Sequence, residues 1–460
     1  MQIDWATSLD LHVELDAGGG RRVAVERAIR GAIRSGRLRA GERLPATRAL
    51  ARDLGLARGT VAEAYAQLVS EGYLRTRPGA PTLVAAGVQP AEPARAGTPA
   101  PPAPRFDLQV GVPDVGAFPR TAWLAALRRA LAAAPDRALG FGDARGQPEL
   151  RVALAGYLGR ARGVLADPER IVVCSGFAEG LALLCRALRE SGARSLAMED
   201  PCLRYHRAVA AASGLRPVAM PVDDRGARPG VPAGAGAALV TPAHQFPLGA
   251  TLAPDRRSAL VAWARAAGTV VIEDDYDGEF RYDRQPAGAL QGLDTEHVVY
   301  TGTASKTLAP GLRLGWLVLP QRLLEPVIKA KRLAGDTQAL DQLALAELIR
   351  SGALDRHVRR MRQRYRRRRD GLLELLAARA PALRVRGIAA GLHLVLELPP
   401  GGVREAELLE RAASRSLRLN PLGPFWHEPH GQAEGLVLGY AAPPEHAYGQ
   451  ALGALADVLD

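Results

Sequence analysis

The chain has 460 residues, a length typical of two or three domains, and 47% of them are apolar, enough for a large core. Its formal net charge of +12 permits a polyanionic partner without identifying one. The sequence contains no uninterrupted run of about eighteen apolar residues, so we expect no membrane span. The acidic, mixed first residues predict no secretory signal, so we expect a cytoplasmic protein. Three cysteines without metal-ligand spacing predict buried free thiols: Cys174, Cys185 and Cys202.

The first predicted domain spans residues 11–85 and is mainly helical. Apolar spacing predicts helices over 21–36, 44–55 and 57–72, each ending at or near a glycine. Residues 73–85 then alternate and turn at Pro78-Gly79, which favours a two-stranded wing. Residues 86–105 are rich in Pro and Ala and predict a linker, which leaves 106–460 as the second domain.

Two short helices, a tight turn and a wing are typical of a helix-turn-helix DNA-binding unit. The third helix begins with an arginine and a threonine that suit base edges or phosphate. Residues 36–84 resemble the winged helix of the GntR superfamily nearly from end to end. That resemblance implies a double-stranded DNA operator as partner and DNA contacts by Arg48, Arg58, Thr60 and Gly79. For each arginine alone, a solvated helix face is the alternative.

The second domain alternates helical segments with short β-rich runs. This pattern predicts an α/β fold with a mostly parallel, doubly wound sheet. Beyond about residue 385 the sequence predicts a smaller α+β subdomain. The β-rich runs are 170–176, 195–200, 237–243, 269–276, 297–302 and 315–320.

Lys306 follows one of these runs, in the sequence TGTASK. An amine forms an imine with an aldehyde when burial or nearby cations lower its pKa. The hydroxyls of Thr303 and Ser305 can bind a phosphate, and Arg313 can pair with it. A Ser-Lys pair by itself is more often an ordinary surface lysine.

Asp274 and Tyr276 end another β-rich run, and in extended chain they point to the same side. A carboxylate keeps the ring nitrogen of pyridoxal 5′-phosphate (PLP) protonated, and a phenol can donate to the ring oxygen. The adjacent carboxylates could instead hold a metal, although no His or Cys accompanies them. A glycine-containing turn into a helix offers amides to a phosphate at Ser175, Gly176 and Phe177.

Together these pieces resemble the fold type I aminotransferases, and the whole chain resembles a MocR-type regulator: a GntR winged helix, a linker and an aminotransferase-like domain. The resemblance implies PLP as cofactor, with Lys306 as its Schiff-base lysine, Asp274 at the pyridine nitrogen and Tyr276 at the ring oxygen. Around the phosphate it implies Ser175, Gly176, Phe177, Thr303, Ser305 and Arg313. It also implies a homodimer, including a domain-swapped arrangement in which the winged helix packs on the partner subunit.

Several positions depart from the aminotransferase pattern. Leu203 stands where relatives have an aromatic residue on the cofactor ring, and Tyr205 or His206 could compensate. Phe141 replaces a tyrosine that in relatives reaches the neighbouring subunit's phosphate.

Two substrate-binding groups also differ. Aminotransferases have an asparagine where this chain reads HQFP, so His244 or Gln245 could fill that space. They also have an arginine for the substrate carboxylate, which is absent from the sequence GLVLGY; Arg418 is a candidate substitute for an effector carboxylate.

We therefore expect a transcriptional regulator that senses PLP itself, an amine or an amino acid, with at most partial transamination. The alternatives are an aminotransferase with an accessory DNA-binding domain, or a PLP store without operator specificity. One further motif fits none of these directly: nine arginines occupy the fourteen positions from Arg356 to Arg369. They could contact DNA or an acidic partner subunit, or form a solvated helix face.

Overall fold

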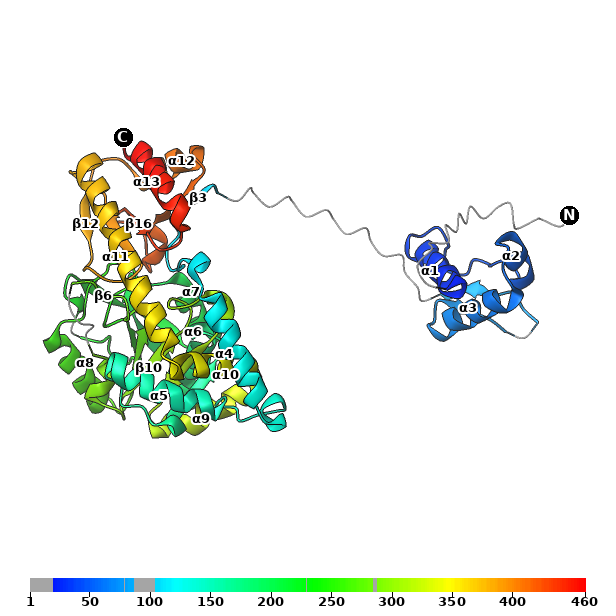
Figure 1. Cartoon of the computed structure of the whole chain (residues 1–460), viewed down its shortest axis with the longest axis horizontal. Coiled ribbons are helices and arrows are strands. Elements are labelled where there is room, and N and C mark those ends of the chain that lie inside the picture. Colours follow the sequence, from blue (N-terminus) through cyan, green and yellow to red (C-terminus); the bar gives the residue numbers. More distant parts are fainter. Residues whose placement is uncertain (1–19, 78, 87–103, 229, 284–287) are drawn as a thin grey trace. The chain divides into compact units, whose positions relative to one another are not determined.

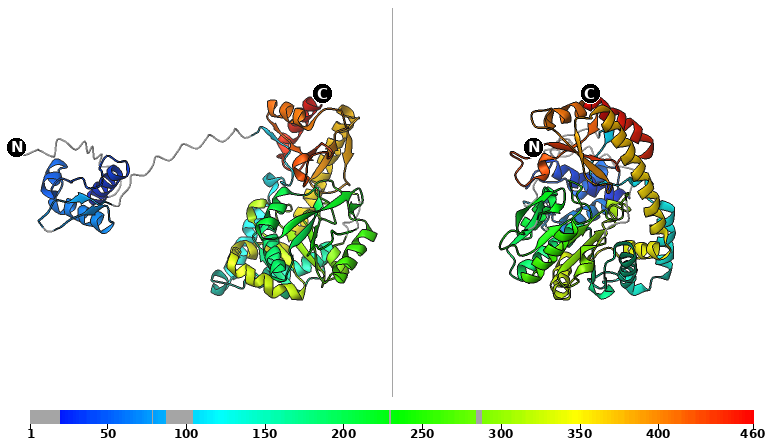
Figure 2. Two further views of the ribbon diagram at one scale, coloured as in Figure 1. Left: turned by 180° about the vertical axis from the view of Figure 1, so that it is seen from behind. Right: turned by 90° about the vertical axis from the view of Figure 1, so that its left-hand side faces the viewer.

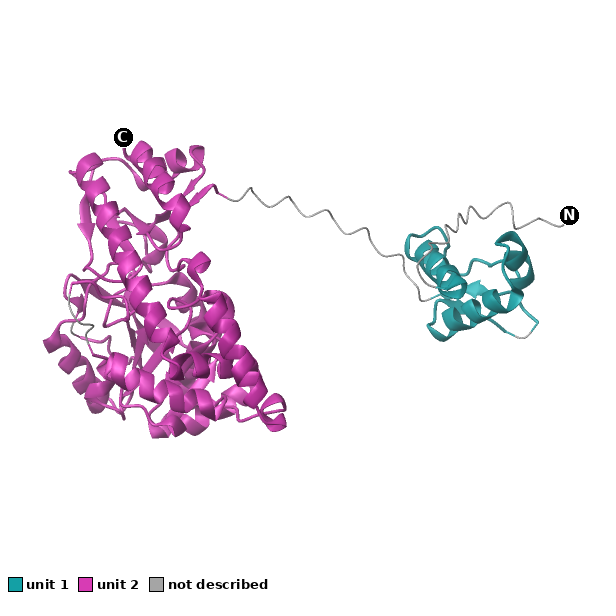
Figure 3. Ribbon diagram, viewed as in Figure 1, with its two compact units in different colours: residues 1–102 teal, residues 103–460 magenta. Residues whose placement is uncertain are grey.

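The computed structural model describes residues 20–77, 79–86, 104–228, 230–283 and 288–460. The chain divides into two compact units, residues 1–102 and 103–460 (Figure 3). The division falls inside the predicted linker, most of which lies outside the described residues, as do positions 11–19 of the predicted first domain and Pro78 of the wing. In the described residues, none of the helices is long and apolar enough to cross a membrane.

The first unit has the predicted three helices and wing. Its helices are α1 (Arg21–Arg34), α2 (Thr47–Asp53) and α3 (Arg58–Ser70). Its two strands pair antiparallel and are β1 (Leu74–Arg75) and β2 (Leu83–Val84). Apolar residues from all three helices and the wing form one core, including Val25, Ile29, Val61, Leu68 and Val84.

The second unit is built on an eight-stranded sheet with the order β4-β11-β10-β9-β8-β5-β6-β7. Strands β10, β9, β8, β5 and β6 are mutually parallel, whereas β11 runs antiparallel to both of its neighbours. The strands are β4 (Ile171–Cys174), β5 (Ser195–Asp200), β6 (Arg216–Asp223), β7 (Gly226–Ala227), β8 (Ala238–Val240), β9 (Val271–Asp275), β10 (Val298–Thr303) and β11 (Gly315–Val318). The prediction of a mostly parallel sheet is confirmed, but it missed β6 and β7.

Helices cover the sheet on both faces. They are α4 (Arg120–Ala133), α5 (Pro148–Arg162), α6 (Phe177–Glu190), α7 (Arg204–Ala212), α8 (Pro254–Ala266), α9 (Gln321–Ala334) and α10 (Ala339–Arg350). Short 3-10 turns lie at Val115–Ala117, Asp136–Leu139, Pro168–Arg170, Leu290–Leu293, Pro310–Leu312 and Gly423–Phe425. Clusters of buried residues fill the space between the helices and the sheet.

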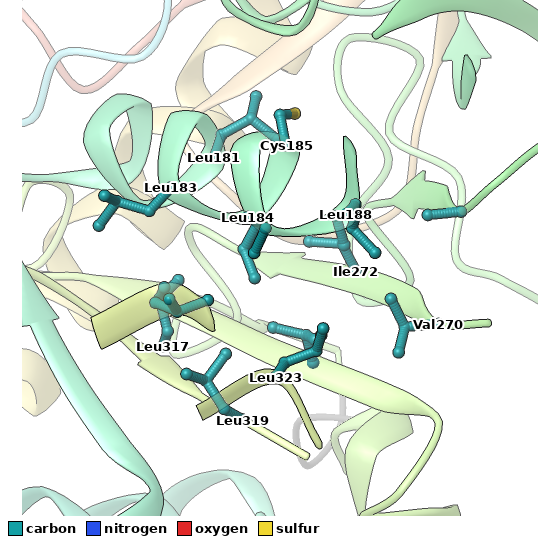
Figure 4. Packing of buried hydrophobic residues seen from close by; sticks show 14 of the residues in the cluster. Leu181, Leu183, Leu184, Cys185, Leu188, Val270, Ile272, Leu317, Leu319 and Leu323 are labelled. Atoms are coloured by element: carbon teal, nitrogen blue, oxygen red, sulfur yellow. The ribbon is translucent and has the colours of Figure 1, made fainter. Parts of the chain in front are cut away.

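Helix α6 illustrates the packing that fixes the site. Leu184 and Leu188 lie one helical turn apart, so they share one face of the helix. In Figure 4 these two side chains point toward strand residues Ile272 and Leu317, whereas Leu181 points to the other side of the helix with Cys185. All five leucine and isoleucine side chains are buried. Each such side chain contributes about 1.5–3 kcal/mol through burial, so the cluster holds the N-terminus of α6 firmly at the end of the sheet.

The smaller subdomain lies at one end of the second unit, and the long helix α11 (Ala353–Arg379) runs to it from the large sheet (Figures 1 and 2). Its four-stranded sheet has the order β12-β13-β16-β15. The remaining elements are β12 (Arg384–Arg386), β13 (His393–Glu397), α12 (Glu405–Ser414), β14 (Leu417–Arg418), β15 (Asn420–Pro421), β16 (Gly435–Gly439) and α13 (Glu445–Leu459). Strand β3 (Phe106–Asp107) pairs with β14, so the first residues after the linker belong to this subdomain.

Candidate functional site

A cavity of about 270 Å³ opens at the carboxyl ends of the parallel strands. Strands β5, β8, β9 and β10 and the N-terminus of α6 all contribute to its lining, which is the usual place for a ligand in a doubly wound sheet. Of the predicted cofactor residues, the following line it: Phe177, Asp274, Tyr276, Thr303, Ser305, Lys306 and Arg313.

Lys306 lies in this cavity three residues beyond β10. Its Nζ donates a hydrogen bond to the carbonyl oxygen of Gly111. Burial lowers the pKa of the Lys306 amine, although the carboxylates of Asp277 and Asp274 oppose the effect. A lowered pKa increases the fraction of neutral amine, the form that attacks an aldehyde.

Asp274 is 5% exposed, and its Oδ1 is a buried atom without a hydrogen-bond partner. Burial, followed by the repulsion of Asp275, raises the pKa of the Asp274 carboxyl well above its usual value. An unpartnered buried carboxylate is costly, so this position fits a ligand that brings a positive N–H group. Asp275 lies on the opposite side of the strand and is already paired, with Arg162 at 2.6 Å.

The other end of the cavity suits a phosphate. Gly176 precedes α6 with a φ of +88°, and a Cβ atom there would lie 3.3 Å from the guanidinium of Arg313. Arg313 itself adopts a left-handed conformation with a φ of 50°. The Thr303 hydroxyl donates to Ser305 Oγ at 2.9 Å, so two hydroxyls, a guanidinium and a helix N-terminus converge. Ser175 and Gly176 flank this end without lining the cavity.

Together these groups fit PLP: an amine of lowered pKa, a buried carboxylate that lacks a partner, and a cradle for phosphate. Two of the carboxylates on β9 already have partners within the protein, namely Glu273 and Asp275. Glu273 accepts hydrogen bonds from the backbone amides of Leu290 and Gln291.

The remaining wall of the cavity is mostly apolar. Leu203 lines it, and so does His206, whose ring centroid lies 4.5 Å from that of Phe177. Burial, with the nearby Lys306 amine, lowers the pKa of His206 to about 3, so the ring is neutral at pH 7. Within the described residues, Arg313 is the only arginine of the lining.

Two substitutes suggested by the sequence lie elsewhere. From the HQFP segment, Phe246 lines the cavity, whereas His244 and Gln245 do not. Gln245 instead donates to the backbone carbonyl oxygens of Pro201, at 2.9 Å, and Phe246, at 2.7 Å. Arg418 lies on β14, where its guanidinium is 3.2 Å from the carboxylate of Asp107, and it does not reach the cavity.

Sequence reasoning missed a buried polar cluster behind Tyr276. His244 Nδ1 lies 3.0 Å from the Tyr276 hydroxyl and 2.9 Å from the Asp277 carboxylate. His393, on β13 of the smaller subdomain, packs against the His244 ring and bonds to the carbonyl oxygen of Pro247 at 3.0 Å. The cluster holds the Tyr276 hydroxyl in place. Its members lie 32 to 149 residues from one another apart from the adjacent pair at 276 and 277, so no local pattern signals it.

The predicted DNA contacts lie on the first unit. Arg48, on α2, and Arg58, the first residue of α3, are exposed, and Thr60 is half-buried in the first turn of α3. Gly79 lies in the wing turn with a φ of +75°, a conformation that side chains disfavour. All three cysteines are buried and free, as expected.

Comparisons with known proteins agree with both units. Residues 21–84 match the family described as "Bacterial regulatory proteins, gntR family", and residues 104–418 match "Aminotransferase class I and II". Among solved structures, kynurenine aminotransferase of Pyrococcus horikoshii has a TM-score of 0.68 and 25% identity, covering 77% of this chain and 90% of its own. An archaeal alanine:glyoxylate aminotransferase shares the fold, with a TM-score of 0.69 and 24% identity. The match covers 76% of this chain and 89% of that protein.

Regulators match over nearly the whole length. The "HTH-type pyridoxine biosynthesis transcriptional regulator PdxR" of Corynebacterium glutamicum is 34% identical over 94% of each chain. The "Probable rhizopine catabolism regulatory protein MocR" of Rhizobium meliloti is 34% identical over 90% of this chain and 88% of its own. The chain therefore belongs to the MocR-type transcriptional regulators, in which a GntR-type DNA-binding unit is joined to an aminotransferase-like domain, and its cofactor is PLP.

Proposed function

We propose that this DNA-binding regulator responds to the occupancy of the cavity around Lys306. The observation that carries the proposal is the pairing of a buried amine of lowered pKa with a buried carboxylate atom that has no partner. When bound, PLP supplies an aldehyde for an amine and a ring that withdraws electrons from it. Lys306 would bond to the aldehyde carbon and Asp274 would hold a proton on the ring nitrogen.

The neighbouring side chains would orient the ring. Tyr276 would donate from its hydroxyl to the ring oxygen, with His244 fixing the direction of that hydroxyl. The phosphate would be held by Arg313, by the hydroxyls of Thr303 and Ser305, and by the amides at Ser175, Gly176 and Phe177. Leu203 would pack on the ring through apolar contact alone.

The effector is proposed to be PLP itself or a small amine or amino acid that enters the same cavity. The relative named for pyridoxine biosynthesis supports PLP. The apolar wall offers no second guanidinium in the described part of the chain, which disfavours efficient turnover of amino acids and supports sensing over catalysis. The regulators that match over about nine-tenths of this chain also favour this reading over an aminotransferase.

A homodimer, with the winged helix packed on the same or the partner subunit, is proposed as the active assembly. Apolar side chains remain exposed along α4 and the segment after it: Leu124, Leu131, Leu139 and Phe141. Grouped apolar surface of this kind is unusual on a monomer and suits a protein interface. Phe141, which is fully exposed, stands where relatives reach the neighbouring subunit.

The DNA contacts are proposed to come from the predicted residues of the first unit. Arg58 would reach a base edge or phosphate from the start of α3, with Thr60 beside it. Arg48 would contact the backbone from α2, and Gly79 would let the wing tip approach a groove.

The test compares binding to the DNA upstream of the chain's own gene with and without PLP. We expect sequence-specific binding whose affinity changes on PLP addition, and a loss of about 1–3 kcal/mol with Arg58→Ala. Keto-acid production is measured in parallel. Rapid multiple turnover with no specific DNA binding would overturn the proposal in favour of an aminotransferase.

A further inference from the structure

The arginines of the long helix α11 lie on different faces of the helix. Its inward face is apolar and packs on the body of the unit through buried residues that recur at helical spacing, including Leu354, Val358, Met361, Tyr365 and Leu372. Because a helix turns about 100° per residue, these side chains occupy one sector of its circumference.

Three arginines on and beside this inward face have structural partners. Arg368 is buried and contacts the carboxylates of Asp114, at 3.0 Å, and Glu445, at 2.8 Å. Arg364 bonds to the same Asp114 carboxylate at 3.0 Å, and Arg362 donates to the carbonyl of Glu279 at 2.8 Å. These side chains connect the helix to the rest of the unit, and groups within the unit already bind their guanidinium groups.

The opposite face carries a second set, which we call the arginine stripe. All of its members are exposed: Arg356, Arg359, Arg360, Arg366 and Arg367. On an α-helix they fall within a sector of about 120°, together with Gln363. No carboxylate occurs between positions 356 and 369. Figure 1 shows α11 (yellow to orange) running along the outside of the second unit.

The stripe has few partners in its own surroundings. Arg356 donates to the carbonyl oxygen of Ser351 at 3.3 Å, and Arg360 bonds to His357 Nδ1 at 3.0 Å. Among the described residues, Arg359 and Arg367 have no hydrogen bond and no ion pair within 4 Å, and Arg366 reaches Asp370 only at 3.9 Å. Arg356 lies three and four positions before Arg359 and Arg360, and like charges at these spacings destabilise a helix by about 0.2–0.5 kcal/mol per pair. The stripe therefore costs helix stability, which an anionic partner would offset.

We propose that the arginine stripe binds the phosphate backbone of the DNA that the winged helix holds, as a second contact that carries no sequence information. This proposal rests on the DNA-binding function of the chain. The stripe is about 16 Å long, the axial distance over which duplex DNA carries about ten phosphates. Seventeen residues, 87–103, join the described parts of the two units, and a chain of this length extends to at most about 60 Å, which allows both units to meet the same DNA molecule.

The test uses the full-length chain with Arg359→Gln and Arg367→Gln combined. The control combines Arg186→Gln on α6 with Arg216→Gln on β6, which are likewise exposed and unpaired among the described residues, so the net charge changes equally. Binding to a duplex of about 60 base pairs is measured from 50 to 200 mM salt, first with the upstream DNA and then with an unrelated sequence.

The stripe variant is expected to reduce the slope of log affinity against log salt by about two on both duplexes, and the control to leave it unchanged. Equal slopes in all three proteins, or an equal decrease in both variants, would overturn the proposal. Sedimentation velocity tests whether the stripe instead binds a second copy of the chain. If the stripe variant dissociates a dimer and leaves the salt slope unchanged, the stripe is a contact between subunits and the proposal is overturned. The unrelated duplex contains no operator, so the effect of the stripe on it can be measured even if operator recognition fails, and the two failures remain distinguishable.

Discussion

The side chains that line the cavity around Lys306 fall into two sets with different chemistry. One set can hold a charged ligand: Asp274 with its unpartnered oxygen, Arg313 beside Gly176, and the hydroxyls of Thr303 and Ser305. Much of the remaining lining is apolar or neutral, including Val110, Cys202, Leu203, His206 and Phe246. The cavity therefore has charged and polar groups for a cofactor but few for a second, substrate molecule. Such a site suits the detection of a bound molecule better than repeated catalytic turnover.

The first test of this comparison removes one of the groups that can hold a charged ligand. Asp274→Asn keeps the size of the side chain but removes the charge opposite the ring nitrogen. We expect PLP to bind about 30- to 150-fold more weakly, a loss of about 2–3 kcal/mol, because a charged hydrogen bond is lost. Fluorescence titration of the apoprotein with PLP measures the change.

Its neighbour provides the control. Asp275→Asn breaks the buried pair with Arg162 and should lower the thermal unfolding temperature while changing PLP affinity less. Equal losses of PLP affinity in the two variants would contradict the assignment of Asp274.

A second prediction concerns Glu199, a buried carboxyl in the cavity lining. Burial raises its pKa to about 7, while hydrogen bonds from Thr241 and Gln245 only partly compensate. The folded state therefore binds this proton more tightly than the unfolded state, so the contribution to stability is fully present below about pH 4.5 and is lost as the pH rises through 7.

Relative to Glu199→Gln, the wild-type apoprotein should thus lose about 1–3 kcal/mol of stability between pH 5 and pH 8. Thermal unfolding of both proteins at the two pH values tests this, because other titrating groups are common to both. A difference that is independent of pH would show that Glu199 is well solvated and that the wall is less apolar than described.

The smallest expected effect comes from restoring an aromatic residue on the apolar wall. Leu203→Tyr should strengthen PLP binding by about 0.5–1.5 kcal/mol through ring stacking, with Leu203→Ala weakening it as the matched control. Calorimetric titration measures both. Weaker binding by the tyrosine variant would mean that Leu203 does not lie over the ring.

How far the sequence predicts this protein depends on how local each signal is. The runs that form β4, β5, β8, β9, β10 and β11 are recognisable because each is a short segment rich in apolar residues. Strand β6 was missed because it contains Pro217 and Pro221, which lack the N–H group that a strand interior needs. Strand β3 was missed because two residues carry no periodicity, and only its pairing with β14 defines it.

The residues of the site also differ in how local their sequence signals are. Lys306, Asp274 and Tyr276 stand at strand ends, where a motif and its spacing are visible together. The partner of Tyr276 was not visible, because His244 approaches it from a separate loop and His393 from another subdomain. The HQFP segment was recognised as unusual, but only the fold shows that Phe246, and not His244, faces the cavity.

The central claim is that Lys306 bonds to PLP and that this occupancy changes DNA binding. The most direct measurement follows the visible absorbance of bound PLP and the affinity for upstream DNA, in wild type and in Lys306→Ala, as PLP is added. We predict that the substitution abolishes the shifted absorbance band and the PLP-dependent change in DNA affinity, while DNA binding without PLP is retained. A variant that keeps both the band and the change in affinity would contradict the account.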